Sequence, residues 1–242
     1  MPRRTAHPLD GDRRHPGDQS LRLPPTALRP RGRFRADQPG RQFPFALVVG
    51  PSQPKLSSFE ALIEAARAAP GRLTYASWGV ASTPHLATER MLRARAVEML
   101  HVPFTSQAPA MQAVMAGQVD CFALPAGGAE SMTRDGRTRA VAVMAPGPLA
   151  IIPGAPLMKD MGVDLTSGLW KAIYAPARTP PALLERLNLA VREAMAAPPF
   201  VEVVRQQGTV PEPTTPEALA AFGRSERAAW GAVVKATGAT LD

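Results

Sequence analysis

LTYASWGVASTP, at residues 73–84, contains a complete transition from a strand to a helix. The apolar and β-prone residues of Leu73–Ser77 predict a short strand. The small residues of Gly79–Ser82 predict a loop. Thr83 followed by Pro84 predicts a helix N-cap with proline at the first helical position. Such a passage from strand through short loop to helix is typical of α/β proteins.

The same alternation continues on both sides of this stretch. We expect further strands at residues 45–49, 97–102, 119–124 and 139–144. We expect helices that begin at the capping or proline signals of Ser57, Pro109, Thr179 and Thr214. At the first of these, Glu60 would complete a capping box with Ser57. We expect helix ends at Gly117 and Gly238. Strands and helices joined by short connections predict an α/β fold with a largely parallel sheet.

Three predicted loops share one design, in which a strand ends, small or hydroxyl residues follow, and a helix begins. They lie at residues 77–83, 103–108 and 124–128. In a parallel sheet all three emerge at the carboxyl edge, where open α/β proteins bind ligands. Helix N-termini there offer unpaired N–H groups and partial positive charge to an anion. The alternative interpretation is that the Ser and Thr residues are ordinary helix caps.

Residues 1–41 differ in composition from the rest of the chain. They contain ten Arg, seven Pro and four Asp but no Lys, Val, Ile, Tyr or Trp, and they carry +6 of the total charge of +8. Scattered Arg and Pro with few apolar residues predict a disordered or non-native tail over residues 1–42. The alternative, a tail that binds nucleic acid, has almost no aromatic residues for base stacking. We therefore expect no nucleic-acid partner.

Signatures of enzymes are absent from the sequence, which has no P-loop, no nucleophile elbow and no zinc-protease motif. Cys121 is the single cysteine and lies inside a predicted strand, which favours a buried, inert thiol. His85 at a helix start and His101 in a strand have no partner at metal-ligand spacing. We expect no cofactor, no metal and no catalysis. The alternative is a cytoplasmic enzyme of small acids that depends on His85 or Cys121.

Membrane and export signals are also missing from the sequence as written. No apolar run approaches the ~18–20 residues of a membrane-spanning helix. The first residues lack the apolar stretch of about 7–15 residues that a secretory signal needs. Taken literally, the sequence predicts a chain that stays in the cytoplasm.

Several short motifs resemble, in the same order, the extracytoplasmic solute-binding receptors of tripartite tricarboxylate transporters, the Bug-type family. The resemblance runs from about Phe45 to Asp242. The motifs that carry it lie at residues 46–52, 70–77, 79–87, 101–104, 108–110, 117–120, 139–143, 175–180, 187–188 and 230–235.

The resemblance implies a two-lobed fold like that of type II periplasmic binding proteins, with mainly parallel sheets and an incomplete first lobe. The first domain of the chain would comprise residues 43–52 and 174–242, and the second domain would comprise residues 53–173. The chain would cross between the two domains near residues 49–52 and 174–176. It also implies a periplasmic receptor that binds a small carboxylate and meets membrane permease subunits; we expect a monomer. The candidate ligand-binding residues are Ser77, Gly79, Val80, Ala81, Ser82, Thr83, His85, Phe104, Thr105 and Ala108.

Family members begin with a signal peptide and about half of the first domain, and neither is seen before Phe43. The resemblance therefore implies an N-terminal truncation that impairs binding. We interpret the residues before about Gln42 as a frame-shifted product of a family sequence, because GC-rich codons read out of register yield the Arg and Pro bias of residues 33–41. Translation of the upstream DNA in the other two frames tests this hypothesis.

Overall fold

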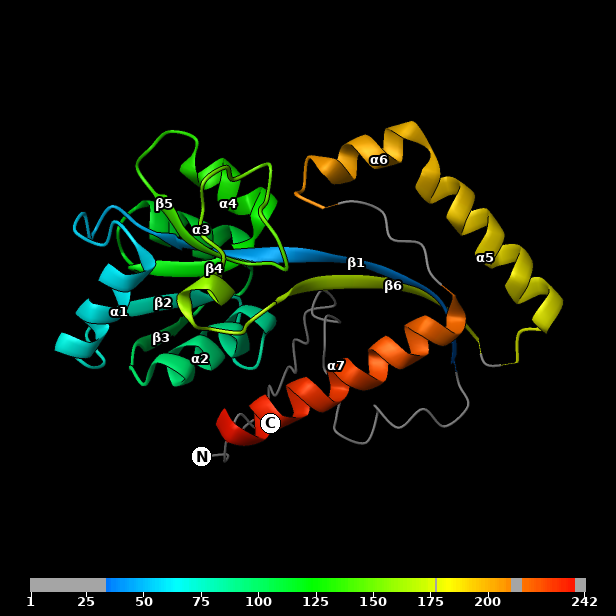
Figure 1. Cartoon of the computed structure of the whole chain (residues 1–242), viewed down its shortest axis with the longest axis horizontal. Helices are drawn as coiled ribbons and strands as arrows, with labels where there is room; N and C mark the ends of the chain where they lie inside the picture. The colour runs from blue at the N-terminus through cyan, green and yellow to red at the C-terminus, as the bar shows by residue number, and fades with distance from the viewer. Residues whose placement is uncertain (1–33, 177, 210–214, 238–242) are drawn as a thin grey trace, which may run out of the picture.

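The computed structural model describes residues 34–176, 178–209 and 215–237. Figure 1 shows two lobes that the long ribbons β1 and β6 connect. The larger lobe holds α1 (Phe59–Ala68), β2 (Thr74–Ser77), α2 (Thr83–Arg95), β3 (Leu100–Pro103), α3 (Gln107–Met115), β4 (Cys121–Pro125), α4 (Ala126–Thr133), β5 (Arg139–Met144) and the 3-10 helix η1 (Met158–Met161). The smaller lobe holds α5 (Pro181–Ala196), α6 (Pro198–Arg205) and α7 (Pro216–Thr237), beside β1 (Phe34–Val49) and β6 (Gly168–Pro176).

The sheet of the larger lobe has the strand order β3-β2-β4-β1-β5. Strand β2 pairs in parallel with β3 and β4. Strand β1 runs antiparallel to β4, β5 and β6. The sheet is therefore mixed, which corrects the prediction of a mainly parallel one. The reason is that β1 enters this sheet from the smaller lobe, against the direction of the strands on either side of it.

Both faces of the sheet are covered, and the central strand shows how. In β1, the fully buried Phe45 and Leu47 belong to the core on one face, where α1 and α2 pack. Their neighbours Ala46 and Val48 belong to the core on the other face, where α3 and α4 pack. A strand buried on both sides carries a continuous apolar run rather than an alternating one. This is why the run at residues 45–49 is a sound strand signal.

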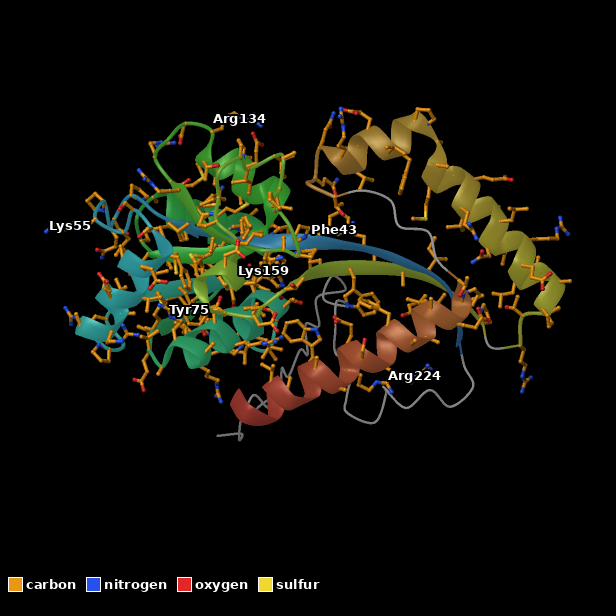
Figure 2. All side chains as sticks on the ribbon, viewed as in Figure 1. Phe43, Lys55, Tyr75, Arg134, Lys159 and Arg224 are labelled. Atoms are coloured by element: carbon orange, nitrogen blue, oxygen red, sulfur yellow. The ribbon has the colours of Figure 1, made fainter. Side chains whose placement is uncertain are left out.

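The chain passes between the lobes at Pro44 and Gly168, which pair with each other in the β1–β6 ladder. Figure 2 labels Phe43 at this crossing, on β1 at the margin of the larger lobe. Residues 45–49 lie between β4 and β5, so the crossing is not at residues 49–52 and 174–176 as expected. The predicted domain boundaries thus differ from the observed pairing, and the division into domains stays a prediction.

The predicted tail also ends earlier than residue 42. Strand β1 begins at Phe34, and residues 34–44 pair with β6 over almost its whole length. Backbone pairing with a neighbouring strand depends little on side-chain composition, and this is how an Arg- and Pro-rich segment can form a strand. Residues 1–33, and the helix end predicted at Gly238, lie outside the described residues.

Several element boundaries differ from the sequence predictions by one or a few residues. Helix α1 is capped by Ser58 rather than Ser57, since the Ser58 hydroxyl accepts from the Ala61 N–H at 3.1 Å. Glu60 does not complete a capping box but pairs with Arg95. The loop expected at residues 125–128 is largely the first turn of α4. Strand β6 and helix α6 were not predicted at all, whereas β5 has its predicted bounds.

Candidate functional site

The three predicted loops do meet at one edge of the sheet. Because β2, β3 and β4 are parallel, their carboxyl ends lie side by side. The Phe104 N–H donates to the Ser77 carbonyl at 2.8 Å and ties the ends of β3 and β2 together. Phe45 pairs with Pro125, so the crossing to the smaller lobe lies at the same edge. The predicted site therefore faces the junction of the two lobes.

The helices that begin at this edge lack side-chain caps. Ser82 before α2 and Ser106 before α3 make no capping hydrogen bond, and Pro125 before α4 cannot make one. Helix α1 begins at the opposite edge, because β1 is antiparallel to β4, and it is capped by Ser58. The interpretation of ordinary side-chain capping thus does not hold for α2, α3 or α4, the three helices that follow the predicted loops. First-turn N–H groups without a cap are suited to an anion.

Only two of these three helix starts are accessible from the lobe junction. A Cβ on Gly127 would lie 3.2 Å from the Cα of Gln207, so the segment after α6 covers the start of α4. Val80 in the loop before α2 is 55% exposed, and Thr105 before α3 is also exposed. The candidate site therefore consists of loop 78–82 with the start of α2, and residues 104–106 with the start of α3.

Loop 78–82 is held by its own short-range hydrogen bonds. The Ser82 hydroxyl donates to the Gly79 carbonyl at 2.6 Å instead of capping α2. Gly79 has a φ of +123°, which favours glycine, and a Cβ there would meet no atom within 4 Å. Ala81 has a φ of +59°, and its N–H donates to His85 Nδ1 at 3.0 Å. The backbone is thus bent so that it borders open space.

Beneath the loop, three aromatic rings form a stack. The His85 and His101 ring centroids lie 4.1 Å apart at 20°, and those of His101 and Tyr75 lie 4.9 Å apart at 20°. Tyr75 donates to Glu89 Oε1 at 2.6 Å. Burial lowers the pKa of His85, opposed by the Glu89 carboxylate. Burial, with His85 adding to it, lowers the pKa of His101 to about 4.

The predicted site residues divide into supporting and accessible ones. Ser77 is fully buried, and its hydroxyl accepts from the Gly79 N–H at 3.1 Å and lies 2.6 Å from His101 Nε2. His85 is 9% exposed. The predicted residues with accessible surface are Gly79, Val80, Ala81, Ser82, Thr83, Phe104, Thr105 and Ala108. The structure brings all ten to one edge, and their contact with a ligand stays a prediction.

Sequence reasoning missed three residues that support the site. Tyr75 and His101 belong to the ring stack, which only the parallel pairing of β2 and β3 brings together. Trp78 packs edge-on against Phe45 and Phe122, with ring centroids 5.9 Å apart in both pairs. A large aromatic residue directly before a loop glycine was a usable signal for such an anchor.

The groups on which an enzyme would depend are engaged or buried. His85 Nδ1 is used by Ala81, and Cys121 is fully buried with the pKa of its thiol raised by that burial. The burial of Cys121 is as predicted. Within residues 34–176, 178–209 and 215–237, no His, Cys, Asp and Glu side chains gather in a group that could hold a metal. In the same residues, no helix is long and apolar enough to cross a bilayer.

A cavity of about 1050 Å³ lies in the smaller lobe between α5 and α7, away from the candidate site. Tyr174 lines it, whereas Trp170 packs edge-on against Phe222. Arg192, Arg224 and Arg227 line it together with Glu185 and Glu217. None of the ten predicted residues borders this cavity, which is an open groove between helix flanks rather than part of the carboxyl edge.

The comparisons with a family model and with related proteins agree on one family. Residues 39–239 match the family model described as "Tripartite tricarboxylate transporter family receptor". The chain is 34% identical to the UPF0065 protein in the tcbD-tcbE intergenic region of Pseudomonas sp. strain P51, over 77% of this chain and 56% of that protein. It is 31% identical to protein BugT of Bordetella pertussis, over 82% of this chain and 61% of BugT. The chain thus spans little more than half of these relatives.

Solved structures show the same fold. R. palustris Rpa4515 with adipate matches with a TM-score of 0.78 and 25% identity, over 88% of this chain and 72% of that one. The periplasmic binding protein BugD matches with a TM-score of 0.74 and 23% identity, over 86% of this chain and 71% of BugD. The predicted two-lobed α/β fold is confirmed by these matches.

Proposed function

The chain belongs to the tripartite tricarboxylate transporter receptor family, a family of solute-binding receptors, and from that premise we propose that it binds a small dicarboxylate at the carboxyl edge of β2 and β3. The observation that carries the proposal is the pair of uncapped helix starts at this edge. Each exposed helix start contributes about 0.3–1 kcal/mol toward an anion, and more where water is excluded. Two starts side by side suit one carboxylate group.

The roles of the residues follow from their exposure. The donors that a carboxylate can reach are the first-turn N–H groups of α2 and α3 and the hydroxyls of Thr83 and Thr105. The Gly79 and Ala81 N–H groups and the Ser82 hydroxyl are already used within the loop. Ser77 and His85 lie beneath the loop and hold its shape. No cationic side chain is part of the set, so recognition rests on backbone and hydroxyl donors. The adipate bound by the related Rpa4515 supports a dicarboxylate as ligand class.

The location between two lobes supports a transport role. Closure of the smaller lobe over the carboxyl edge would bury the ligand and shift an equilibrium between open and closed forms. Membrane permease subunits would sense the closed form. BugD is a periplasmic binding protein, and we extend that location to this protein.

A thermal-shift titration with adipate tests the proposal. A ligand that binds only the folded state raises the Tm with increasing concentration. The variant Val80→Asp places a negative charge on the loop and should abolish the shift. The matched control is Leu100→Asp, because Leu100 is 57% exposed against 55% for Val80 but begins β3 at the opposite edge.

We expect the control to retain the shift of the unmodified chain. No shift with adipate or with shorter and longer dicarboxylates, in a folded sample, would refute the proposal. An equal shift in Val80→Asp and Leu100→Asp would place the binding site elsewhere.

A further inference from the structure

The conformation of loop 78–82 depends on a residue in the left-handed region of backbone space. Among the described residues, only Ala81 and Ala96 have positive φ without being glycine. Ala96 ends α2, and its N–H donates to the carbonyls of Arg93 and Leu92. Ala81 has no such helix-end hydrogen bonds; its N–H donates to a side chain, His85 Nδ1, at 3.0 Å. A strained alanine persists only where its surroundings hold it.

His85 is itself fixed in place. It is 9% exposed, and its ring stacks on that of His101. His101 Nε2 lies 2.6 Å from the Ser77 hydroxyl, and the His101 ring also packs against Tyr75, which donates to Glu89. The ring that receives the Ala81 N–H is thus part of a cluster of three rings anchored on β2 and β3. A rigid acceptor of this kind can impose a conformation on a short loop.

We propose that His85 is the positioning residue of the site: its Nδ1 accepts the Ala81 N–H and holds loop 78–82 in the shape that leaves the start of α2 open to an anion. The inference deepens the proposed function and rests on it for the anion. It assigns His85 no contact with the ligand. It also explains why a histidine stands two residues after the first residue of α2, where its ring reaches back over the loop.

The hydrogen bond requires His85 to be neutral with its proton on Nε2, because a protonated Nδ1 would turn a donor toward the Ala81 donor. The titratable groups around the ring are Tyr75 from β2, His101 from β3 and Glu89 from α2. Helix α7 packs against α2 and carries Glu226, whose carboxylate accepts from the Trp230 indole N–H. Burial favours the neutral ring, and the Glu89 carboxylate favours the charged one. Acidification should therefore release the loop.

Two variants separate the hydrogen bond from the stacking. His85→Phe keeps an aromatic ring but removes the acceptor, and His85→Gln supplies an amide oxygen that can accept from Ala81 without titrating. At pH 7.5 and without ligand, amide exchange of Ala81 should be at least tenfold faster in His85→Phe and close to the unmodified rate in His85→Gln. The Leu100 N–H, which donates to the Leu73 carbonyl at the other edge, is the internal control and should not change.

Adipate titrations on the same samples should show affinity at least tenfold weaker for His85→Phe and restored in His85→Gln. If Ala81 exchange follows His85 but adipate binds no sample, the inference holds and the proposed function fails. If adipate binds equally well to all samples and Ala81 exchange is unchanged, the inference fails and the proposed function stands.

A measurement on the unmodified chain keeps the inference testable if the variants do not fold. Nitrogen-15 NMR of the His85 ring at pH 7.5 should show the neutral form with its proton on Nε2. A proton on Nδ1 would overturn the inference, because that atom could not accept from Ala81.

Discussion

The Ser77 hydroxyl oxygen lies 2.6 Å from His101 Nε2 beneath the candidate loop, where Ser77 is fully buried and His101 is half-buried. The same oxygen accepts from the Gly79 N–H at 3.1 Å and lies 2.9 Å from the Gly79 carbonyl. One hydroxyl proton can serve either the carbonyl or the imidazole, so the tautomer of His101 decides which. A single serine thus links the end of β2, the turn of the loop and the adjacent strand β3.

Replacing this serine should destabilise the protein without creating a large cavity. Ser77→Ala leaves the Gly79 N–H and His101 Nε2 without their buried partner, at a cost of about 1–3 kcal/mol. Ser106→Ala is the matched control, because Ser106 is exposed and makes no capping hydrogen bond. Urea denaturation followed by Trp fluorescence measures both. Equal free energies of unfolding for the two variants would contradict the role of Ser77.

The stability of the protein should fall as the pH falls from about 6.5 to about 4. Burial lowers the pKa of His101 to about 4, whereas in the unfolded chain it is about 6.5. Between these values the unfolded chain takes up a proton that the folded one does not, so acid favours unfolding. Above about pH 6.5 this contribution is complete.

The urea midpoint at a series of pH values measures the effect. His101→Gln should be less stable at neutral pH, because it alters the ring stack, but should lose less stability on acidification. Parallel pH curves for the two proteins would show that His101 does not contribute.

Asp120 should matter for stability and not for binding. Its carboxylate accepts from the Thr74 N–H and hydroxyl, both at 2.8 Å, and from the Ser52 hydroxyl at 3.0 Å, at the amino end of β2. Asp120→Ala leaves these donors unpaired and should cost about 1–3 kcal/mol. The exposed Asp160 provides the control Asp160→Ala, which we expect to be neutral.

Adipate should still raise the Tm of Asp120→Ala above the lowered Tm of that variant without ligand, because the candidate site lies at the other edge of the sheet. Loss of the shift in a folded sample would show that the two edges are coupled.

The crossing between the lobes should tolerate no side chain at Gly168. A Cβ there would overlap the Phe43 carbonyl, a backbone group that cannot turn away, and would lie 3.0 Å from Pro44 Cα. We expect Gly168→Ala to lower the Tm or to prevent folding. Gly231→Ala is the opposite case, since Gly231 is inside helix α7 with no atom within 4 Å of a Cβ. That variant should gain about 0.5–1 kcal/mol from helix propensity.

Differential scanning calorimetry on both glycine variants gives the comparison. A Gly168→Ala protein as stable as the unmodified chain would mean that the ladder between β1 and β6 can open without cost.

The smaller lobe should promote self-association. Most of the large exposed apolar side chains among the described residues lie on its elements: Ile173, Tyr174, Leu183, Leu187, Leu189, Phe200 and Val203. Exposed apolar patches of this kind favour aggregation. Leu189→Gln should reduce concentration-dependent association in sedimentation velocity, whereas Leu100→Gln, on the larger lobe and equally exposed, should not. A monomer at all concentrations would contradict this and support the original expectation.

Much of the larger lobe could be predicted because its signals are local. The bounds of β5 and the end of α3 before Gly117 follow from neighbouring residues alone. The three strand-to-helix transitions were also visible, and parallel pairing brings their loops to one edge. The prediction of a loop from the glycines at residues 127 and 128 was wrong, because both lie in α4. Gly127 lets the backbone of Gln207 approach the helix, and Gly128 lies against the Gln107 side chain.

Which strands are neighbours, and in which direction they run, was decided by contacts between residues far apart in the chain. No local signal shows that β1 runs antiparallel to the strands on both sides of it, or that residues 34–44 pair with β6. The stack of Tyr75, His101 and His85 has the same origin, because two strands and a helix must pack before the rings meet. Short-range chemistry specifies where a donor-rich loop begins and ends, while the shape that could make it a binding site is imposed by buried side chains from elsewhere in the fold.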